Sequence, residues 1–299
     1  TGSYNERTML MIDGIESNIL YAQNMNISSD FPLTAIDRIE IIYGPASAIY
    51  GPNVFSGVIN VITKSASDLK DNTNRVFIQN GIGTDNTQFA EITYLAKYNP
   101  VELSVTYRRY KSDMFDMTGR PGYFDEKLFG NPRLWGPYAE YYPEFDNRVD
   151  DNALISRLKI KNIELGYSHL LTKHGNGSEY TYDKTMPTTN WKFGRDIFFL
   201  KYNNNFSDEL SISFLATYQK GGSLPDNVWS QGWNSYDDWD SLRTVELLTW
   251  KYISRKWSIF QDFEYRPSKH WIINGGIKYS SAEYQKSYRS EEHTSELQS

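Results

Sequence analysis

The 299-residue chain contains no cysteine and only four histidines. The absence of cysteine excludes disulfides, thiol chemistry and cysteine-based metal sites. No apolar run reaches the roughly 18 residues that a transmembrane helix needs. A formal net charge of −6 argues against a nucleic-acid scaffold, so we expect no nucleic-acid partner. The histidines show no metal-binding spacing, and no catalytic grouping stands out, so we expect no metal site, no cofactor and no enzyme activity.

Aromatic residues are abundant, with 23 tyrosines, 15 phenylalanines and 8 tryptophans. Such a content is typical of membrane β-barrels, whose aromatic girdles lie at the two membrane surfaces. The low mean hydropathy does not conflict with a barrel, because its strands alternate lipid-facing and lumen-facing residues and so average to polar. An aromatic-rich soluble β-sandwich is the alternative.

From Arg75 onward the chain shows long segments with an apolar and polar alternation of period two. One segment places Val101, Leu103, Val105 and Tyr107 on one face and Glu102, Ser104, Thr106 and Arg108 on the other. Residues 90–98, 163–171, 210–218 and 271–279 repeat the pattern. Because the second face is polar or charged, we expect the apolar face to meet lipid and the polar face to line a wet lumen.

The connections between these segments alternate in length. Short ones fall at residues 98–100, 161–162, 203–208 and 266–269, and long ones at 112–150, 173–190 and 221–243. Short periplasmic turns and long extracellular loops are typical of outer-membrane barrels. The alternation of short and long connections requires residues 244–266 to form one very long strand. We expect about nine strands in all, with residues 75–83 and 269–280 as the two edge strands.

The stretch Asp37–Lys64 is different, since two short β-rich runs, Arg38–Tyr43 and Gly57–Thr63, flank a hinge rich in glycine and proline. Within the hinge, Ala46–Tyr50 could form one helical turn. Upstream, Asp13-Gly14 predicts a turn, and Pro32–Ile36 predicts a short helix that begins at its proline.

This stretch closely resembles the end of the plug domain of TonB-dependent outer-membrane receptors. The matching residues are Arg38, Ile39, Glu40, Gly44, Pro45, Ser47, Tyr50, Gly51, Gly57, Val58, Ile59, Asn60, Ile62, Thr63 and Lys64, and Met9–Gly14 resembles the preceding strand and turn of the same plug. The resemblance implies a mostly β protein: a partial antiparallel transmembrane β-barrel, about nine strands of the roughly 22 that the family closes, with a small α+β plug at the amino terminus.

The implied organisation has three parts. Residues 1–68 are expected to be the carboxy-terminal part of the plug, and residues 69–288 the first part of the barrel. Residues 289–299 resemble a translated sequencing adapter, so we expect natural sequence to end near Tyr288 and the tail to be unpacked. The resemblance also implies an export signal, a TonB box and more of the plug upstream, and further strands downstream.

The resemblance carries a set of plug residues that contact the barrel: Arg38, Glu40, Gly44, Pro45, Ser47, Tyr50, Gly51, Gly57 and Asn60. Arg38 and Glu40 flank Ile39 and so project to the same side of their strand. In the family the matching residues form ion pairs with the barrel wall. The alternative is a plain surface salt bridge, worth at most about 1 kcal/mol.

Candidate ligand-binding residues lie in the polar plug loop and in two aromatic-rich loops: Tyr21, Gln23, Asn24, Trp135, Tyr138, Trp229 and Trp233. Aromatic side chains in loops suit stacking on planar ligands, and they equally suit packing of the loops on one another. The plug loop could also be an ordinary solvated loop.

By resemblance, such a receptor binds a scarce nutrient outside the cell, and TonB rearranges the plug so that the ligand passes the outer membrane. The ligand is then a small-molecule metal chelate, such as a ferric siderophore or a cobalamin. The plug carries Ile42–Ala48 in place of the lysine-aspartate-alanine-serine-alanine variant of many glycan importers, which favours a chelate. The alternative is a secreted β-rich carbohydrate-binding or adhesion module.

Overall fold

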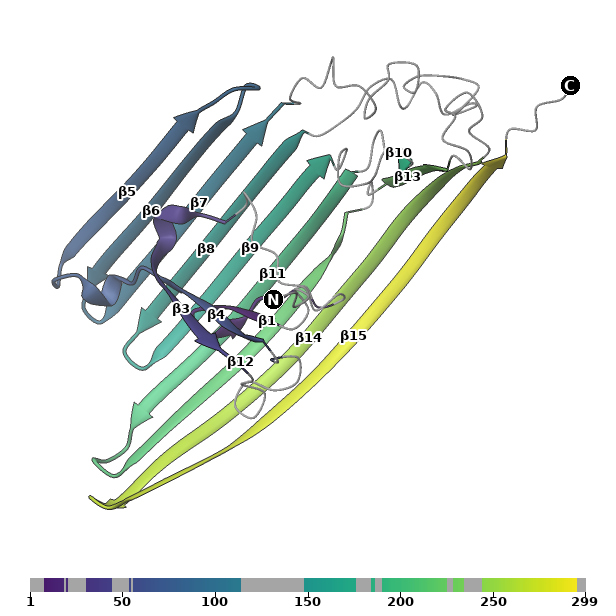
Figure 1. Cartoon of the computed structure of the whole chain (residues 1–299). Coiled ribbons are helices and arrows are strands. Elements are labelled where there is room, and N and C mark those ends of the chain that lie inside the picture. The colour runs from purple at the N-terminus through teal and green to yellow at the C-terminus, as the bar shows by residue number, and fades with distance from the viewer. Residues whose placement is uncertain are drawn as a thin grey trace, which may run out of the picture.

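A computed structural model describes residues 8–18, 20, 31–44, 54, 56–113, 148–175, 184–185, 190–224, 228–233 and 244–294. Within these ranges the chain forms a large antiparallel sheet, here called the wall, and a small four-stranded sheet, here called the plug. The strands of the wall lie side by side in one tilted, curved layer (Figure 1). The partial barrel that the sequence predicts is thereby confirmed.

Nine long strands make up the described wall, and each pairs with its neighbour in sequence among them. They are β5 (Thr73–Ile82), β6 (Gln88–Tyr98), β7 (Val101–Ser112), β8 (Val149–Ile160), β9 (Ile163–Gly175), β11 (Asn190–Asn205), β12 (Leu210–Ser223), β14 (Thr244–Ser268) and β15 (Trp271–Thr294). The predicted very long strand is confirmed as β14. Two short strands lie in regions predicted as loops: β10 (Lys184–Thr185) and β13 (Val228–Trp233).

Strand β13 pairs with Thr244–Thr249 of β14, beyond the point where β12 leaves its partner at Ile253. The part of β14 that extends past β12 therefore has a partner on that edge as well. This explains why a segment predicted as loop forms a strand, since an extended edge offers unpaired N–H and C=O groups to any neighbouring chain.

Strand β15 corrects the expectation for the chain end. Residues 289–294 continue this strand and pair with residues 244–249 of β14, so they are not unpacked. These residues can extend the strand whatever their side chains are, because strand pairing uses the backbone N–H and C=O groups. The assignment of residues 289–299 to a non-native tail stays an expectation.

The plug sheet has the order β2-β1-β4-β3, formed by β1 (Thr8–Ile12), β2 (Ile15–Glu16), β3 (Ile36–Tyr43) and β4 (Gly57–Thr63). The predicted short helix is confirmed as the 3-10 turn η2 (Leu33–Ala35), which follows Pro32. A second 3-10 turn, η3 (Ala66–Asp68), leads into the wall. The predicted turn at Ala46–Tyr50 lies outside the described residues.

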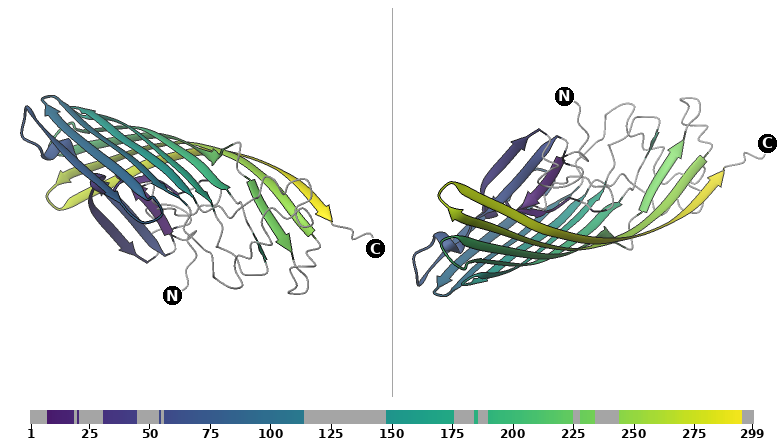
Figure 2. Two further views of the ribbon diagram at one scale, coloured as in Figure 1. Left: turned by 90° about the horizontal axis from the view of Figure 1, so that it is seen from above. Right: turned by 90° about the horizontal axis from the view of Figure 1, so that it is seen from below.

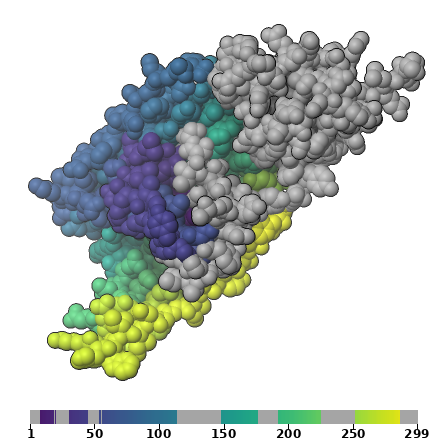
Figure 3. Space-filling view, viewed as in Figure 1, coloured from purple at the N-terminus to yellow at the C-terminus, as the bar shows by residue number. Residues whose placement is uncertain are grey.

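The plug lies against the concave face of the wall in both views of Figure 2, and Figure 3 shows it between the first and the last strands. A shared apolar cluster joins the two sheets, with Leu10, Ile12, Phe31 and Val61 from the plug and Ala153, Ile155 and Leu170 from the wall. The sequence predicts a polar inner face for the wall. It is apolar in places because the plug covers it there.

The two faces of β7 confirm the predicted side-chain directions. Tyr107 is 45% exposed on the outer face, whereas Thr106 and Arg108 are only 4% and 6% exposed on the inner face. Ser104 accepts a hydrogen bond from the backbone N–H of Ala66 in η3, so it also faces the plug side. Among the described residues, no helix is long and apolar enough to cross a membrane.

Candidate functional site: the plug and wall interface

Cationic side chains of the wall hold the plug by its main chain. Arg157 on β8 donates to the carbonyl oxygens of Thr63 and Lys64, at 3.3 and 2.6 Å. Lys201 on β11 donates to the carbonyl oxygen of Asp13 at 2.7 Å. These positions follow from alternation, since odd-numbered residues of β8 and β11 point inward. The wall thus supplies hydrogen-bond donors to the main chain of the plug.

The end of β2 and the residue after it are held in the same way from later strands. Arg195 donates to the carbonyl oxygen of Ser17, and the amide of Gln219 donates to that of Glu16 at 2.8 Å. The carboxylate of Glu16 forms an ion pair with Lys256 at 2.6 Å. Three neighbouring strands, β11, β12 and β14, therefore grip one short plug segment.

The turn itself depends on Asp13 and Gly14, which adopt φ values of 52° and 78°. The Asp13 carboxylate accepts from the N–H and the hydroxyl of Thr63, at 2.8 and 2.7 Å, and lies 3.5 Å from Arg157. The Asn60 side chain accepts from the Gly14 N–H at 3.0 Å. The predicted turn is confirmed, and it links two plug strands to the wall.

A buried carboxylate on β6 holds the other side of the plug. The Glu91 side chain is fully buried and accepts from the backbone N–H groups of Leu33 and Thr34, at 3.1 and 2.9 Å. It also forms an ion pair with Arg108, whose side chain is 8% exposed. Glu91 on the wall therefore caps η2 of the plug, because a negative charge is favourable at the amino-terminal end of a helical turn.

A hydroxyl chain extends this contact into the wall. The Thr34 hydroxyl lies 2.9 Å from that of Thr93, which lies 2.9 Å from that of Thr106. Sequence reasoning missed this interface. The polar residues at inward positions of β6 and β7 are visible in the sequence. The alternation of side chains along a strand cannot tell which of these residues contact the plug.

Arg38 and Glu40 pair with each other in the described structure. Arg38 donates to Glu40 at 2.9 Å and to Asp37 at 3.1 Å, and all three side chains are exposed. The hydrogen bond with Glu40, and to a smaller extent the one with Asp37, raises the pKa of the Arg38 guanidinium. The hydrogen-bond partners of the pair within the described residues all lie in the plug, on the edge strand β3 and on its neighbour β4. A wall contact outside the described residues stays a prediction.

The two motif glycines in the described residues close the base of the hinge. Gly44 adopts a φ of 93°, and its N–H donates to the carbonyl oxygen of Ser56 at 3.1 Å. A Cβ atom on Gly57 would lie 2.2 Å from the carbonyl oxygen of Ile42, so the close approach of β3 and β4 requires glycine. The motif residues Pro45, Ser47, Tyr50 and Gly51 lie outside the described residues.

The ligand-binding candidates are only partly placed. Five of them, Tyr21, Gln23, Asn24, Trp135 and Tyr138, lie outside the described residues. Trp229 and Trp233 lie on β13, beside the start of β14, and only their backbone is described. Their role in binding stays a proposal.

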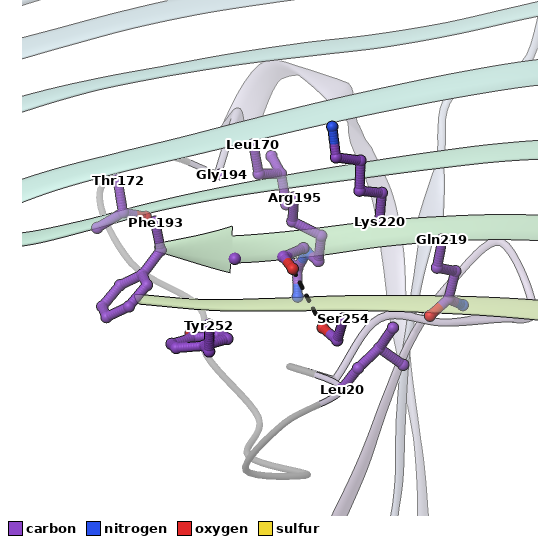
Figure 4. A pocket seen from close by; sticks show the side chains of 12 residues that line it. Leu20, Leu170, Thr172, Phe193, Gly194, Arg195, Gln219, Lys220, Tyr252 and Ser254 are labelled. Atoms are coloured by element: carbon purple, nitrogen blue, oxygen red, sulfur yellow. Dashed lines mark hydrogen bonds between the residues drawn. The ribbon is translucent and has the colours of Figure 1, made fainter. Parts of the chain in front are cut away.

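A small cavity lies where the plug residue Leu20 approaches the wall (Figure 4). Its volume is about 40 Å³, and its lining includes Phe193, Gly194, Arg195, Gly221, Gly222 and Tyr252. The hydroxyl of Ser254 donates to the Gly221 carbonyl oxygen at 3.1 Å, the contact drawn in Figure 4. A cavity of this size holds a few water molecules at most, so it is a seam beside the plug and not a pocket for a chelate.

Comparison with known proteins agrees with this geometry. Residues 1–58 match the family model of the TonB-dependent receptor plug domain. The fold is similar to that of the siderophore receptor PiuA from Acinetobacter baumannii, with a TM-score of 0.62 at 16% identity over 94% of this chain and 39% of that one.

Two further structures have the same fold. The pyoverdine outer-membrane receptor FpvA from Pseudomonas aeruginosa, bound to pyoverdine, gives a TM-score of 0.62 at 14% identity, over 97% of this chain and 40% of that one. The copper transporter OprC gives 0.52 at 13% identity, over 97% and 51%. The chain thus spans about two fifths to one half of their length. By name these proteins are receptors or transporters, not enzymes.

The plug strands and the Asp13-Gly14 turn lie in the matched region, and the wall shares its fold with outer-membrane receptors. Residues 1–58 are therefore identified as a TonB-dependent receptor plug domain, and the wall has the fold of the outer-membrane receptors.

Proposed function

We propose that the receptor containing this chain takes up a scarce nutrient across the outer membrane, with TonB as the partner that moves the plug. The observation that carries the proposal is the nature of the plug and wall interface. Several of its polar contacts join a wall cation to a plug carbonyl group, as at Arg157, Lys201 and Arg195. Water can replace such a cation at each carbonyl group, so the plug is held firmly yet can be released.

We further propose a metal chelate as the nutrient, of the ferric siderophore or cobalamin kind. Two observations support this class. The similar structures include receptors named for a siderophore and for pyoverdine. The plug also carries Ile42–Ala48 where many glycan importers have a lysine-aspartate-alanine-serine-alanine run. The small-molecule ligand would enter between the long loops and meet the plug at its outer end.

The test uses the complete receptor in cells with and without functional TonB. Uptake of radiolabelled iron or cobalamin chelates is measured beside equilibrium binding to the same cells. We expect binding in both strains and uptake only where TonB functions. Uptake that does not need TonB would overturn the proposal.

The motif arginine offers a second test of the same mechanism. We expect Arg38→Ala to impair uptake more than ligand binding, because it acts on plug movement. Lys161→Ala, in an exposed turn of the wall, is the matched control and should change neither. Equal loss of uptake and binding in Arg38→Ala would indicate a folding defect or a direct ligand contact.

The alternative of a secreted carbohydrate-binding module predicts two packed sheets with their apolar faces inside. The described residues instead form a wall whose apolar face is outside, with Leu165, Trp257 and Ile277 at 46%, 60% and 76% exposure. Its other face is covered by the plug. This arrangement suits lipid and not water on the outer face.

A further inference from the structure

The inner face of the wall carries a row of alternating charges, here called the charge row. Its side chains come from five neighbouring strands, β6 to β9 and β11, and each lies directly opposite the next in the order Lys97, Glu102, Lys159, Glu164 and Lys201. By alternation all of them belong to the inward sets of their strands. Opposite charges at directly opposite positions stabilise a pair of strands, so the charge row can neutralise itself without the plug.

At one end of the charge row, the side chains are paired with one another and with η3, the turn that leads from the plug into the wall. Lys97 donates to the carbonyl oxygens of Ser67 and Leu69, both at 3.1 Å. Glu102 accepts from the Ser67 hydroxyl and lies 3.5 Å from Lys159. Lys159 also donates to that hydroxyl at 3.2 Å. Because η3 is joined to β5 by a few residues, this end of the row holds a segment that stays with the wall.

At the other end, the two opposite charges do not bind each other. The Lys201 ammonium group donates to the carbonyl oxygen of Asp13 in the plug turn, at 2.7 Å. The Oε1 atom of Glu164 is buried and has no hydrogen-bond partner among the described residues. A buried acceptor without a donor is unfavourable. Glu164 is therefore an open acceptor beside a cation that the plug holds.

We propose that Lys201 switches partners during transport, and that Glu164 is the positioning residue that receives it. When the turn that contains Asp13 is drawn away, the Lys201 ammonium group passes from the plug carbonyl oxygen to the Glu164 carboxylate. This inference rests on the proposed movement of the plug. The two residues lie opposite each other, with Cβ atoms about 4.5–5.5 Å apart, so rotation of their side chains suffices. The new ion pair stabilises the released state, because a partly buried cation that loses its partner is unfavourable.

The first test displaces the turn by mutation and needs neither a ligand nor TonB. Gly14 adopts a φ of 78°, which a β-branched residue hardly tolerates, so Gly14→Val should dislodge the turn. In the complete receptor in detergent, a carbodiimide couples an amine and a carboxylate in contact as an amide, and mass spectrometry measures the yield. We expect coupling of Lys201 to Glu164 to rise about fivefold in Gly14→Val, the scale of a cross-strand pair of opposite charges. Coupling of Lys159 to Glu102, at the fixed end of the row, is the internal control and should not change.

Transport gives a second measurement, in cells with functional TonB. Glu164→Gln should slow uptake of the radiolabelled iron or cobalamin chelates about fivefold and leave their binding unchanged, because it removes a contact made only after release. Glu164→Asp keeps the carboxylate and should restore most of the rate. The matched control Glu209→Gln removes a carboxylate from an exposed turn of the wall and should transport at the parent rate.

Hydrogen exchange separates this role from support of the resting plug. The Gly14 N–H donates to the Asn60 side chain and reports on the resting turn. Its exchange rate should be the same in Glu164→Gln and in the parent, since Lys201 binds Asp13 in both. Faster exchange in Glu164→Gln would overturn the proposal, and so would a coupling yield that Gly14→Val leaves unchanged. Uptake by the parent without TonB would count against the proposed function instead, and it leaves the coupling measurement unaffected.

Discussion

The replacement Glu91→Gln tests the idea that a wall carboxylate holds the plug. In the parent protein the buried carboxylate accepts from two N–H groups of η2 and pairs with Arg108. The amide retains the shape but has one acceptor oxygen and no charge. One N–H group of η2 then lacks a partner, and Arg108 becomes a buried cation without its ion pair.

The expected loss can be worked from these contacts. Removing one partner of a buried ion pair lowers the free energy of unfolding by about 3–5 kcal/mol. We take this range to include the cost of the N–H group that loses its acceptor. The control Glu264→Gln removes an exposed pair with Arg266, whose side chains are 35% and 57% exposed. That loss should be about 0–1 kcal/mol.

Two measurements on the complete receptor in detergent check the estimate. Denaturant unfolding should show the 3–5 kcal/mol loss for Glu91→Gln only. Amide hydrogen exchange at Leu33 and Thr34 should accelerate at least about tenfold, the factor that corresponds to about 1.4 kcal/mol. The double variant Glu91→Gln/Arg108→Met should recover much of the stability, because no buried charge remains uncompensated. If Glu91→Gln were as stable as Glu264→Gln, the proposed cap would be refuted.

Three further replacements probe other parts of the structure. Gly57→Ala should destabilise the plug by about 1–3 kcal/mol, since its Cβ atom would clash with the Ile42 carbonyl oxygen, and thermal unfolding measures this. Leu103→Lys places a charge on the lipid face at a cost of about 2–4 kcal/mol, which should lower the folded fraction after reconstitution into lipid. Arg157→Gln should weaken its bonds to two plug carbonyl groups, each worth about 1.5–3 kcal/mol, and limited proteolysis should then cleave the plug faster. Unchanged behaviour in any of these assays would contradict the contact that it probes.

Much of the wall could be predicted from the sequence because its signals are local. A strand places successive side chains on opposite faces, so the alternation at residues 101–108 shows directly which side meets lipid. The parity of short and long connections required β14 to be one long strand, which the structure confirms. The turn at Asp13-Gly14 was equally readable, since its backbone conformation suits these two residue types.

The site was less predictable because its contacts join distant parts of the chain. Glu91 is 57 residues from Thr34, and Arg157 is 93 residues from Lys64. Several of these contacts end on backbone carbonyl groups, which every residue has and which leave no pattern in a sequence. The motif pair of Arg38 and Glu40 was recognised in sequence, yet the described wall meets the plug elsewhere.

The sequence by itself determined the strand faces, the turns and the plug motif, because these depend on residues close together in the chain. Only the tertiary structure decided which inward charges of the wall meet the plug, and that residues 289–294 pair with β14. The reason is physical: alternation specifies the direction of a side chain, whereas its partner depends on the register of the wall and the position of the plug.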